Sequence, residues 1–298
     1  MVAILSVYAT ALAYSKKPMS RNSQIGRREL LMLACAAPTF AQSKAEDGFR
    51  SLFDGVSLKG WKRSARELKR PSLGIWTVED GIISGGQDPP GSGIGSYLVS
   101  EETFSDFELK IEARPDWPAD TGILVRTNAQ GNIGFQVLLD HRPHGGIGAY
   151  YGNGLGSWHA WNYSFTAELD ANGTVKKLIP GPAEEPAAGN FTVPLDYAAP
   201  VEEFLRVWKP GGWNEFRIRS VGEVPHLTTW ISGLKVAELD TAKMKASKWD
   251  PAKMVELVGR AGHIALEVHS NGPGDKLGKD RWAPGAVCRW RNIRVKTL

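Results

Sequence analysis

Apolar and polar residues alternate at every second position in several stretches of this chain, which is the pattern of half-buried β-strands. In residues 107–112, Phe107, Leu109 and Ile111 are separated by charged or polar residues. Turn sequences rich in Gly, Asn, Asp and Pro separate such stretches. The pattern predicts many short antiparallel strands, and it recurs in four further segments: 135–139, 216–219, 264–268 and 287–295.

Helical periodicity is confined to two short segments, near 198–207 and 241–258. The 298 residues include 33 Gly and 18 Pro, which suits a β protein with many loops. We therefore predict an all-β fold, a two-sheet antiparallel jelly-roll sandwich. Residues 143–200 are rich in Gly, Pro, Ala and aromatic residues, and we expect an elaborated loop there beside a site. Pro180–Gly189 is predicted to be its flexible tip.

The first 41 residues have the features of an export signal. The adjacent Arg27 and Arg28 resemble a twin-arginine signal, the short apolar run 31–37 follows them, and Ala41 ends a small-x-small cleavage sequence. We expect a cleaved leader over 1–41, a single domain over 42–298, and a periplasmic or extracellular protein. Met19 is a candidate for the native initiator. Cys35 lies in a poor lipobox, which argues against a lipoprotein.

Charge and cysteine content narrow the classes of partner. The formal net charge of +4 belongs entirely to residues 1–41, so residues 42–298 balance to zero and give a nucleic-acid partner no electrostatic basis. The chain contains no run of about 18 apolar residues, so the sequence predicts no membrane-spanning helix. After cleavage Cys288 is the single cysteine, so no intramolecular disulfide forms, and we expect it as a small buried hydrophobe.

A series of short motifs carries a resemblance to a known family. In order they are Phe49–Gly55, Leu58–Trp61, Trp76–Gly81, Phe104–Leu109, Thr121–Arg126, Gly134–Val137, Trp213–Ile218, Gly262–His269 and Trp290–Val295. In this order and spacing, over about residues 47–298, they resemble the 3-keto-disaccharide hydrolase domain family. The resemblance implies a fold like that of concanavalin A-like lectins and glucanases. It also implies an exported bacterial protein that cleaves glycosides already oxidised to a ketone at C3. Glu267 and His269-Ser270 stand where the family commonly has Gln and a His-Gly pair.

The chemistry implied by that resemblance needs a base near the C2 proton and a group that stabilises an enolate oxygen. Glu267 and His269 lie two apart on one predicted strand, so they share a face about 6–7 Å apart, opposite Leu266. We take Glu267 or His269 as the candidate base and Arg126 as the electrophilic partner near the ketone. The alternative is that Glu267 forms an ordinary salt bridge with an arginine at the rim.

Further side chains are candidates for sugar binding. Gln136 and Asp140 share a face, with His141 just beyond the strand end, and they could hold sugar hydroxyls or a divalent cation. The alternative is a polar strand face followed by a turn. Aromatic rings present flat apolar surfaces to sugars, although packing between loop and body accounts for them equally well. The aromatic candidates of the 143–200 segment are Tyr150, Tyr151, Trp158 and Trp161.

Ordinary glycosidase chemistry is disfavoured, because no pair of carboxylates has the spacing that retaining or inverting enzymes use. Two interpretations stay open: a hydrolase or lyase acting on 3-keto-glycosides, and a non-catalytic carbohydrate-binding jelly-roll module. Both take a small-molecule carbohydrate as partner. No cofactor is predicted beyond an optional divalent cation, and the sequence does not define the oligomeric state.

Overall fold

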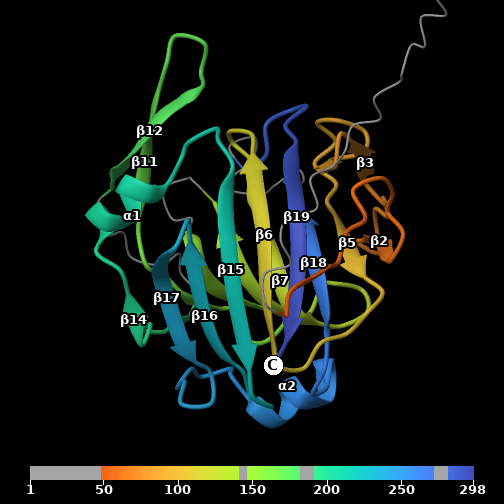
Figure 1. Cartoon of the computed structure of the whole chain (residues 1–298), viewed down its shortest axis with the longest axis vertical. Coiled ribbons are helices and arrows are strands. Elements are labelled where there is room, and N and C mark those ends of the chain that lie inside the picture. The colour runs from red at the N-terminus through yellow and green to blue at the C-terminus, as the bar shows by residue number, and fades with distance from the viewer. Residues whose placement is uncertain (1–47, 141–145, 182–190, 272–280) are drawn as a thin grey trace, which may run out of the picture. The chain divides into compact units, whose positions relative to one another are not determined.

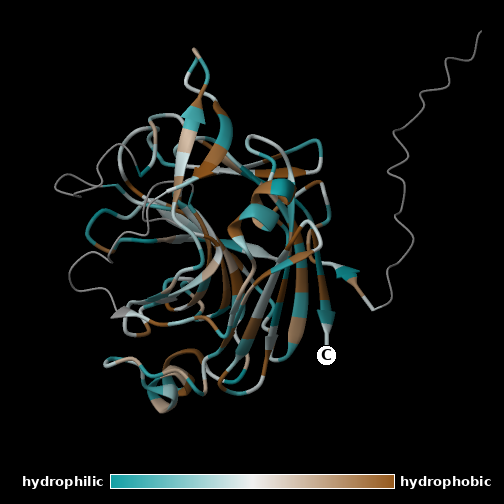
Figure 2. Cartoon of the chain, turned by 90° about the vertical axis from the view of Figure 1, so that its left-hand side faces the viewer, coloured by the Kyte–Doolittle hydropathy of each residue, from teal (hydrophilic) through white to brown (hydrophobic). Residues whose placement is uncertain are grey.

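The protein is described by a computed structural model over residues 48–140, 146–181, 191–271 and 281–298. Two sheets stack face to face, which confirms the predicted all-β sandwich, and Figure 2 shows them from the side as two layers. The first layer, sheet A, lies toward the viewer in Figure 1. Its order is β14 (Tyr197–Ala198), β17 (Leu234–Asp240), β16 (His226–Ile231), β15 (Asn214–Val221), β6 (Phe107–Pro115), β19 (Cys288–Thr297), β4 (Ile82–Gly86) and β3 (Ile75–Glu79), with β1 (Arg50–Ser51) paired to β19.

The second layer, sheet B, is antiparallel except for the parallel pair β10 and β13. Its order is β13 (Phe191–Thr192), β10 (Trp158–Ala160), β9 (Ile147–Asn153), β8 (Gly134–Leu139), β7 (Thr121–Thr127), β18 (His263–Val268), β5 (Ser96–Ser100) and β2 (Trp61–Ala65). A separate hairpin, β11 (Phe165–Leu169) and β12 (Val175–Pro180), extends beyond the two sheets at the upper left of Figure 1.

Two short helices complete the described part of the chain, within the two segments where helical periodicity was predicted: α1 (Val201–Val207) and α2 (Pro251–Val258). The Asp250 carboxylate accepts hydrogen bonds from the Ala252 and Lys253 amides and so caps α2, and Pro251 fits its first turn. Within the described ranges, neither helix has the length and apolar character needed to cross a bilayer. The predicted leader, 1–41, lies outside the described residues.

The core lies between the two sheets and follows the period-two pattern. Phe107, Leu109 and Ile111 of β6 have no exposed surface, and the inward residues of β18 are equally buried. Cys288 is fully buried among them, as predicted, and burial raises the pKa of its thiol far above the ordinary value. The sheets are therefore held together by apolar contact. The residues that alternate with these buried positions along each strand point toward the two outer faces.

The segment 143–200, predicted as an elaborated loop, holds six of the strands, β9 to β14. Two of its glycines, Gly148 and Gly152, allow close packing inside the sandwich. Gly148 has φ of +81°, and a Cβ there would lie 2.6 Å from Val236 of sheet A. A Cβ on Gly152 would lie 2.4 Å from the indole of Trp158. Most of the predicted flexible tip, Pro180–Gly189, lies outside the described residues.

Arg126 joins the loops at one end of the sandwich. Its side chain has no exposed surface, and φ of 50° marks a bulge in β7. The guanidinium donates to the carbonyl oxygens of Gly222 and Gly259 at 3.0 Å and of Glu223 at 3.3 Å. Burial lowers the pKa of Arg126, but an arginine so placed stays charged. Arg126 therefore stabilises the fold by satisfying backbone carbonyls that would otherwise lack a donor.

Replacing this arginine is expected to destabilise the protein. Arg126→Met removes the donor from three backbone carbonyls and leaves a cavity in place of a fully buried side chain, and we expect a loss of about 3 kcal/mol in the free energy of unfolding. Arg260→Met is the matched control, because Arg260 is 76% exposed and its ion pair is with Glu223 on the surface. The control should change that free energy by less than about 0.5 kcal/mol. Urea denaturation measures both, and equal midpoints for the two variants would refute the assignment.

Candidate functional site

A polar cluster occupies the outer face of sheet B, away from the core. Leu266 and Val268 of β18 point into the sandwich, so Glu267 between them points outward, as predicted. Tyr97 of β5 and Gln136 of β8 reach the same face by the same alternation. Glu267 nevertheless has no exposed surface, because other side chains cover it.

Glu267 is held by two donors. An Arg66 guanidinium N–H donates to its Oε1, and the Gln136 amide donates to Oε2 at 2.5 Å. The Arg66 side chain is 19% exposed. Its guanidinium carbon lies over the Tyr97 ring, 5.4 Å from the ring centroid, and one of its N–H groups donates to the Tyr97 hydroxyl at 2.8 Å. The alternative interpretation, a salt bridge from Glu267 to an arginine, is therefore present in the structure as a buried pair. A buried carboxylate is tolerated only with such partners.

His269 follows β18 and faces the same arginine. Its Nε2 lies 3.1 Å from Arg66 Nη2, and a guanidinium can only donate, so Nε2 must accept. Its Nδ1 lies 2.5 Å from the Ser270 carbonyl oxygen, which can only accept. The imidazole is therefore neutral, with its proton on Nδ1 and its lone pair on Nε2. The Asp120 carboxylate lies 3.8 Å from Nε2 and pairs with Arg281 Nε at 3.2 Å.

Aromatic residues extend the same face toward β10. His159 pairs in register with Tyr151, and their ring centroids are 4.4 Å apart. The ring centroid of Trp161 lies 5.2 Å from that of His159. Burial, and to a smaller extent the positive charge of Arg281, lower the pKa of His159 to about 4, while the charge of Asp140 opposes this shift. Arg281 lies close enough to His159 to influence its pKa, and it also pairs with Asp120, which lies beside His269. The polar groups from His159 to Glu267 therefore form one continuous band across sheet B.

The structure brings together Glu267, His269 and Gln136, with Asp140 and Trp161 toward the edge of the band. It does not bring Tyr150 or Trp158 to this face. Both are fully buried on the inner side: Tyr150 donates to the Ala237 carbonyl of sheet A, and the Trp158 ring packs against Phe135. The neighbouring Tyr151 takes the outward position instead, because consecutive strand residues face opposite ways. His141 lies outside the described residues.

Arg126 is also separated from Glu267. Register pairs Leu266 with Ile123, which places Glu267 beside Gly122, four residues along β7 from Arg126. Four strand residues span about 13 Å. The cation next to Glu267 is Arg66 instead, which the sequence analysis missed together with Tyr97, Asp120 and Arg281. Tyr97 could have been found from its alternation with Leu98. Arg66 belongs to a basic stretch without periodicity. It lies 201 residues before Glu267 in the sequence, and only the fold brings the two side chains together.

Metal ligation was left open for Asp140 and His141. Over the ranges that the structure describes, no group of three or more His, Cys, Asp or Glu side chains is arranged to hold a metal ion.

The contact between Gln136 and Glu267 depends on a glycine in the adjacent strand. A Cβ on Gly122 would lie 2.5 Å from Gln136 Nε2 and 2.6 Å from its Cγ, so Gly122→Ala must displace this side chain. We expect it to lower the free energy of unfolding by about 1–3 kcal/mol. In a Gln136→Ala background, the same change should cost less than about 1 kcal/mol, because nothing remains to be displaced. Additive effects in this double-mutant cycle, measured by urea denaturation, would contradict the predicted displacement.

The depressed pKa of His159 predicts a pH dependence of stability. The unfolded chain binds a proton at this residue below about pH 6.5, whereas the folded chain binds it only near pH 4. The contribution of His159 to stability is therefore complete above pH 6.5 and is lost as pH falls from 6.5 to about 4. His159→Gln should flatten the fall in the free energy of unfolding over that interval. An NMR titration midpoint for His159 near 6.5 would show that the imidazole is not held neutral.

Parts of this chain are similar to known proteins. A segment of 81 residues is 35% identical to a 3-keto-disaccharide hydrolase of Bacteroides thetaiotaomicron, and it covers 26% of this chain and 27% of that protein. A provisionally named glycosyl hydrolase from Parabacteroides distasonis aligns with 84% of this chain and 94% of its own, at 15% identity and a TM-score of 0.47. The carbohydrate-binding module CBM66 from Bacillus subtilis aligns with 80% of this chain and 96% of its own, at 10% identity and a TM-score of 0.38. The model of the 3-keto-alpha-glucoside-1,2-lyase-like domain matches residues 48–296, and the chain belongs to that family.

Proposed function

We propose that this protein cleaves the glycosidic bond of sugars already oxidised to a ketone at C3. The family supports a carbohydrate-active role. The observation that supports cleavage of 3-keto sugars is the neutral imidazole of His269, which is held 3.1 Å from the guanidinium of Arg66 beside the buried carboxylate of Glu267. A lone pair and a fixed positive charge are thereby presented together on one face.

The reaction we propose is elimination followed by hydration. A ketone at C3 makes the C2 proton acidic, and a base removes that proton while the electron pair moves into an enolate on the C3 oxygen. The enolate then expels the oxygen substituent at C1, which takes up a proton and departs as an alcohol, and a C1–C2 double bond remains. Addition of water across this bond, with OH at C1 and H at C2, gives the free 3-keto sugar. The protein must supply a base at C2 and a cationic donor at the C3 oxygen.

His269 and Arg66 fit these two requirements. Nε2 of His269 carries a lone pair that can accept the C2 proton, and the Asp120 carboxylate 3.8 Å away would stabilise the resulting imidazolium. The N–H groups of Arg66 would donate to the enolate oxygen. Substrate has to take the place of the hydrogen bond that now joins the two residues.

Glu267 is assigned to positioning rather than to proton transfer. Both of its carboxylate oxygens already accept hydrogen bonds, one from Arg66 and one from Gln136. A base must lie within reach of the proton that it abstracts. Glu267 has no exposed surface, whereas the side chain of His269 is 15% exposed, so a substrate can approach the imidazole but not the carboxylate. Glu267 and Gln136 therefore orient the guanidinium of Arg66.

The test uses the purified protein with 3-keto-trehalose, 3-keto-lactose and their unoxidised parents, with and without EDTA. We expect cleavage of the keto sugars and not of their unoxidised parents, with the products detected by mass spectrometry. When the reaction is run in D2O, we expect one deuterium at C2 of the product. His269→Asn and Arg66→Met should each lower kcat by about 10²–10⁴-fold. His226→Gln is the matched control, because His226 lies on sheet A beside Glu238 and should leave kcat unchanged.

Three results would overturn this proposal or a part of it. Full activity in His269→Asn would remove the base assignment, and cleavage in D2O without deuterium at C2 would favour direct hydrolysis. Binding of keto sugars without cleavage would make the protein a carbohydrate-binding module instead.

A further inference from the structure

The outer face of sheet A carries a strong excess of positive charge. Its three central strands, β6, β15 and β19, are drawn side by side in Figure 1. Residues 42–298 as a whole have no net charge, so this face is balanced by acidic residues elsewhere. The charged residues of the three strands all lie at outward positions and define what we call the cationic face: Lys110, Arg114, Arg217, Arg219, Arg289, Arg291, Arg294 and Lys296, against Glu108, Glu112 and Glu215.

Strand register brings like charges directly opposite one another. Lys110 of β6 is paired with Arg217 on one side and with Arg294 on the other. Arg114 is paired with Arg289. Like charges in directly opposed positions destabilise a sheet. Nothing in the core requires these cations, because the side chains point away from it, so a role outside the fold is indicated.

The carboxylates of this face cannot balance its cations. Glu108 binds Arg217 through two N–H donors at 2.7–3.1 Å, and Glu112 accepts from Arg291 at 2.7 Å. The third, Glu215, lies 3.8 Å from Arg294. Eight cations against three anions leave an excess of five positive charges on the three strands, of which the Asp116 carboxylate just beyond β6 offsets one by pairing with Arg289.

Two tryptophans hold the guanidinium groups in place. Trp213 lies beneath both Arg291, at 4.1 Å, and Arg114, at 4.8 Å, and Trp230 lies beneath Arg217 at 4.9 Å. A guanidinium stacked on an indole ring is fixed in orientation, and its edge can still donate to an acceptor through the N–H groups that Glu108 and Glu112 do not use. These ring faces are therefore occupied by arginine and do not offer the bare platforms on which bases of single-stranded nucleic acid stack.

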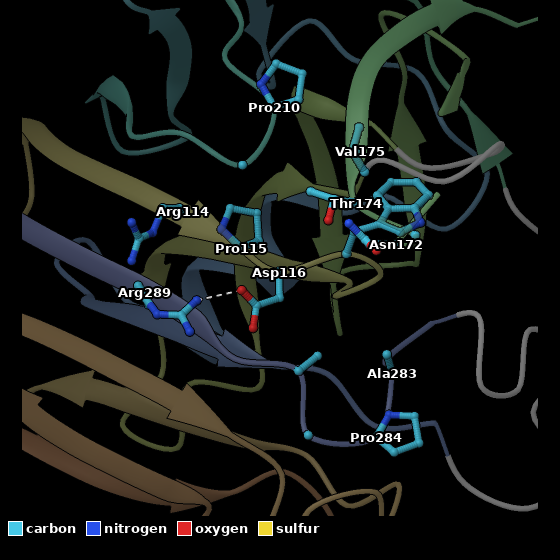
Figure 3. Close-up of a pocket in the computed structure, with 15 residues that line it drawn as sticks. Arg114, Pro115, Asp116, Asn172, Thr174, Val175, Pro210, Ala283, Pro284 and Arg289 are labelled. Atoms are coloured by element: carbon cyan, nitrogen blue, oxygen red, sulfur yellow. Dashed lines mark hydrogen bonds and ion pairs between the residues drawn. The ribbon is translucent and has the colours of Figure 1, made fainter. Parts of the chain in front are cut away.

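A pocket of about 560 Å³ lies at one end of the cationic face (Figure 3). Arg114 and Arg289 belong to both, and Asp116 binds Arg289 at 2.6 Å in the pocket wall. The turn of the β11–β12 hairpin, at Asn172 and Thr174, closes another side. The volume falls in the range of small-molecule sites. None of the residues around Glu267 lines it, so this is a second location on the molecule.

We propose that the cationic face binds an acidic polysaccharide, with carboxylates of uronic acid units on its arginines and lysines and one sugar unit in the pocket. Arginine forks match carboxylate geometry, and the rows of cations repeat at the strand spacing of about 4.8 Å, so a chain with regularly spaced carboxylates can meet several of them. This goes beyond the proposed catalytic function, because it involves the opposite sheet and an unreacted polymer.

The test measures binding of polygalacturonate to the purified protein by calorimetry at low salt. Lys110→Glu should weaken binding about three- to tenfold, because the variant replaces one attractive contact with a repulsive one. The affinity should also fall as salt is raised, as expected for exposed charges. Lys253→Glu is the matched control: it makes the same change in charge at an exposed site on α2 and should leave the affinity unchanged.

Lys110→Glu also provides a check on folding, since it places a carboxylate between Arg217 and Arg294. We expect a melting temperature no lower than that of the parent protein. Equal affinity of parent and Lys110→Glu, or equal loss in the Lys253→Glu control, would overturn the proposal. Tighter binding to duplex DNA or to phosphatidylserine vesicles than to polygalacturonate would also overturn it. Cleavage of 3-keto sugars should be unchanged in Lys110→Glu, so the outcome is separate from that of the proposed function.

Discussion

The buried ion pair between Glu267 and Arg66 determines the arrangement of the outer face of sheet B. A carboxylate with no exposed surface requires a cation and further donors, and the cost of leaving such a charge without its partner is about 3–5 kcal/mol. Arg66 can meet this need only if the chain that follows β2 folds back over the sheet. Once there, the same guanidinium also donates to the Tyr97 hydroxyl and to His269, so one pair fixes the orientations of two further side chains.

Arg66 and Arg126 show how surroundings decide what an arginine can do. Arg126 is enclosed, and its N–H groups are directed at backbone carbonyls of two loops, so it cannot turn toward a ligand without breaking the fold. Arg66 keeps 19% of its side chain exposed, and its partners are side chains in a polar band. A substrate oxygen can therefore compete for the N–H groups of Arg66 but not for those of Arg126.

Local pattern predicted the strands and the face on which Glu267 and His269 lie, because alternation at period two depends only on neighbouring residues. It could not predict partners that the fold brings from distant positions, such as Arg66. It also misplaced Tyr150, because a shift of one residue exchanges the inner and outer faces of a strand. In 143–200, glycines typical of loops are used for close contacts, as at Gly152 against Trp158, and only the packed structure distinguishes the two uses.

The two outer faces of the sandwich can differ in chemistry because the core insulates one from the other. Lys110 and Glu267 lie on strands of different sheets with the apolar layer between them, so the charge of one face has little influence on the hydrogen bonds of the other. The requirements are also opposite. The site on sheet B needs a pair shielded from water so that a neutral imidazole and a guanidinium stay fixed, whereas the cationic face needs exposed charges that an ionic polymer can reach and leave. Binding on sheet A can therefore be altered by substitution without disturbing the geometry around Glu267.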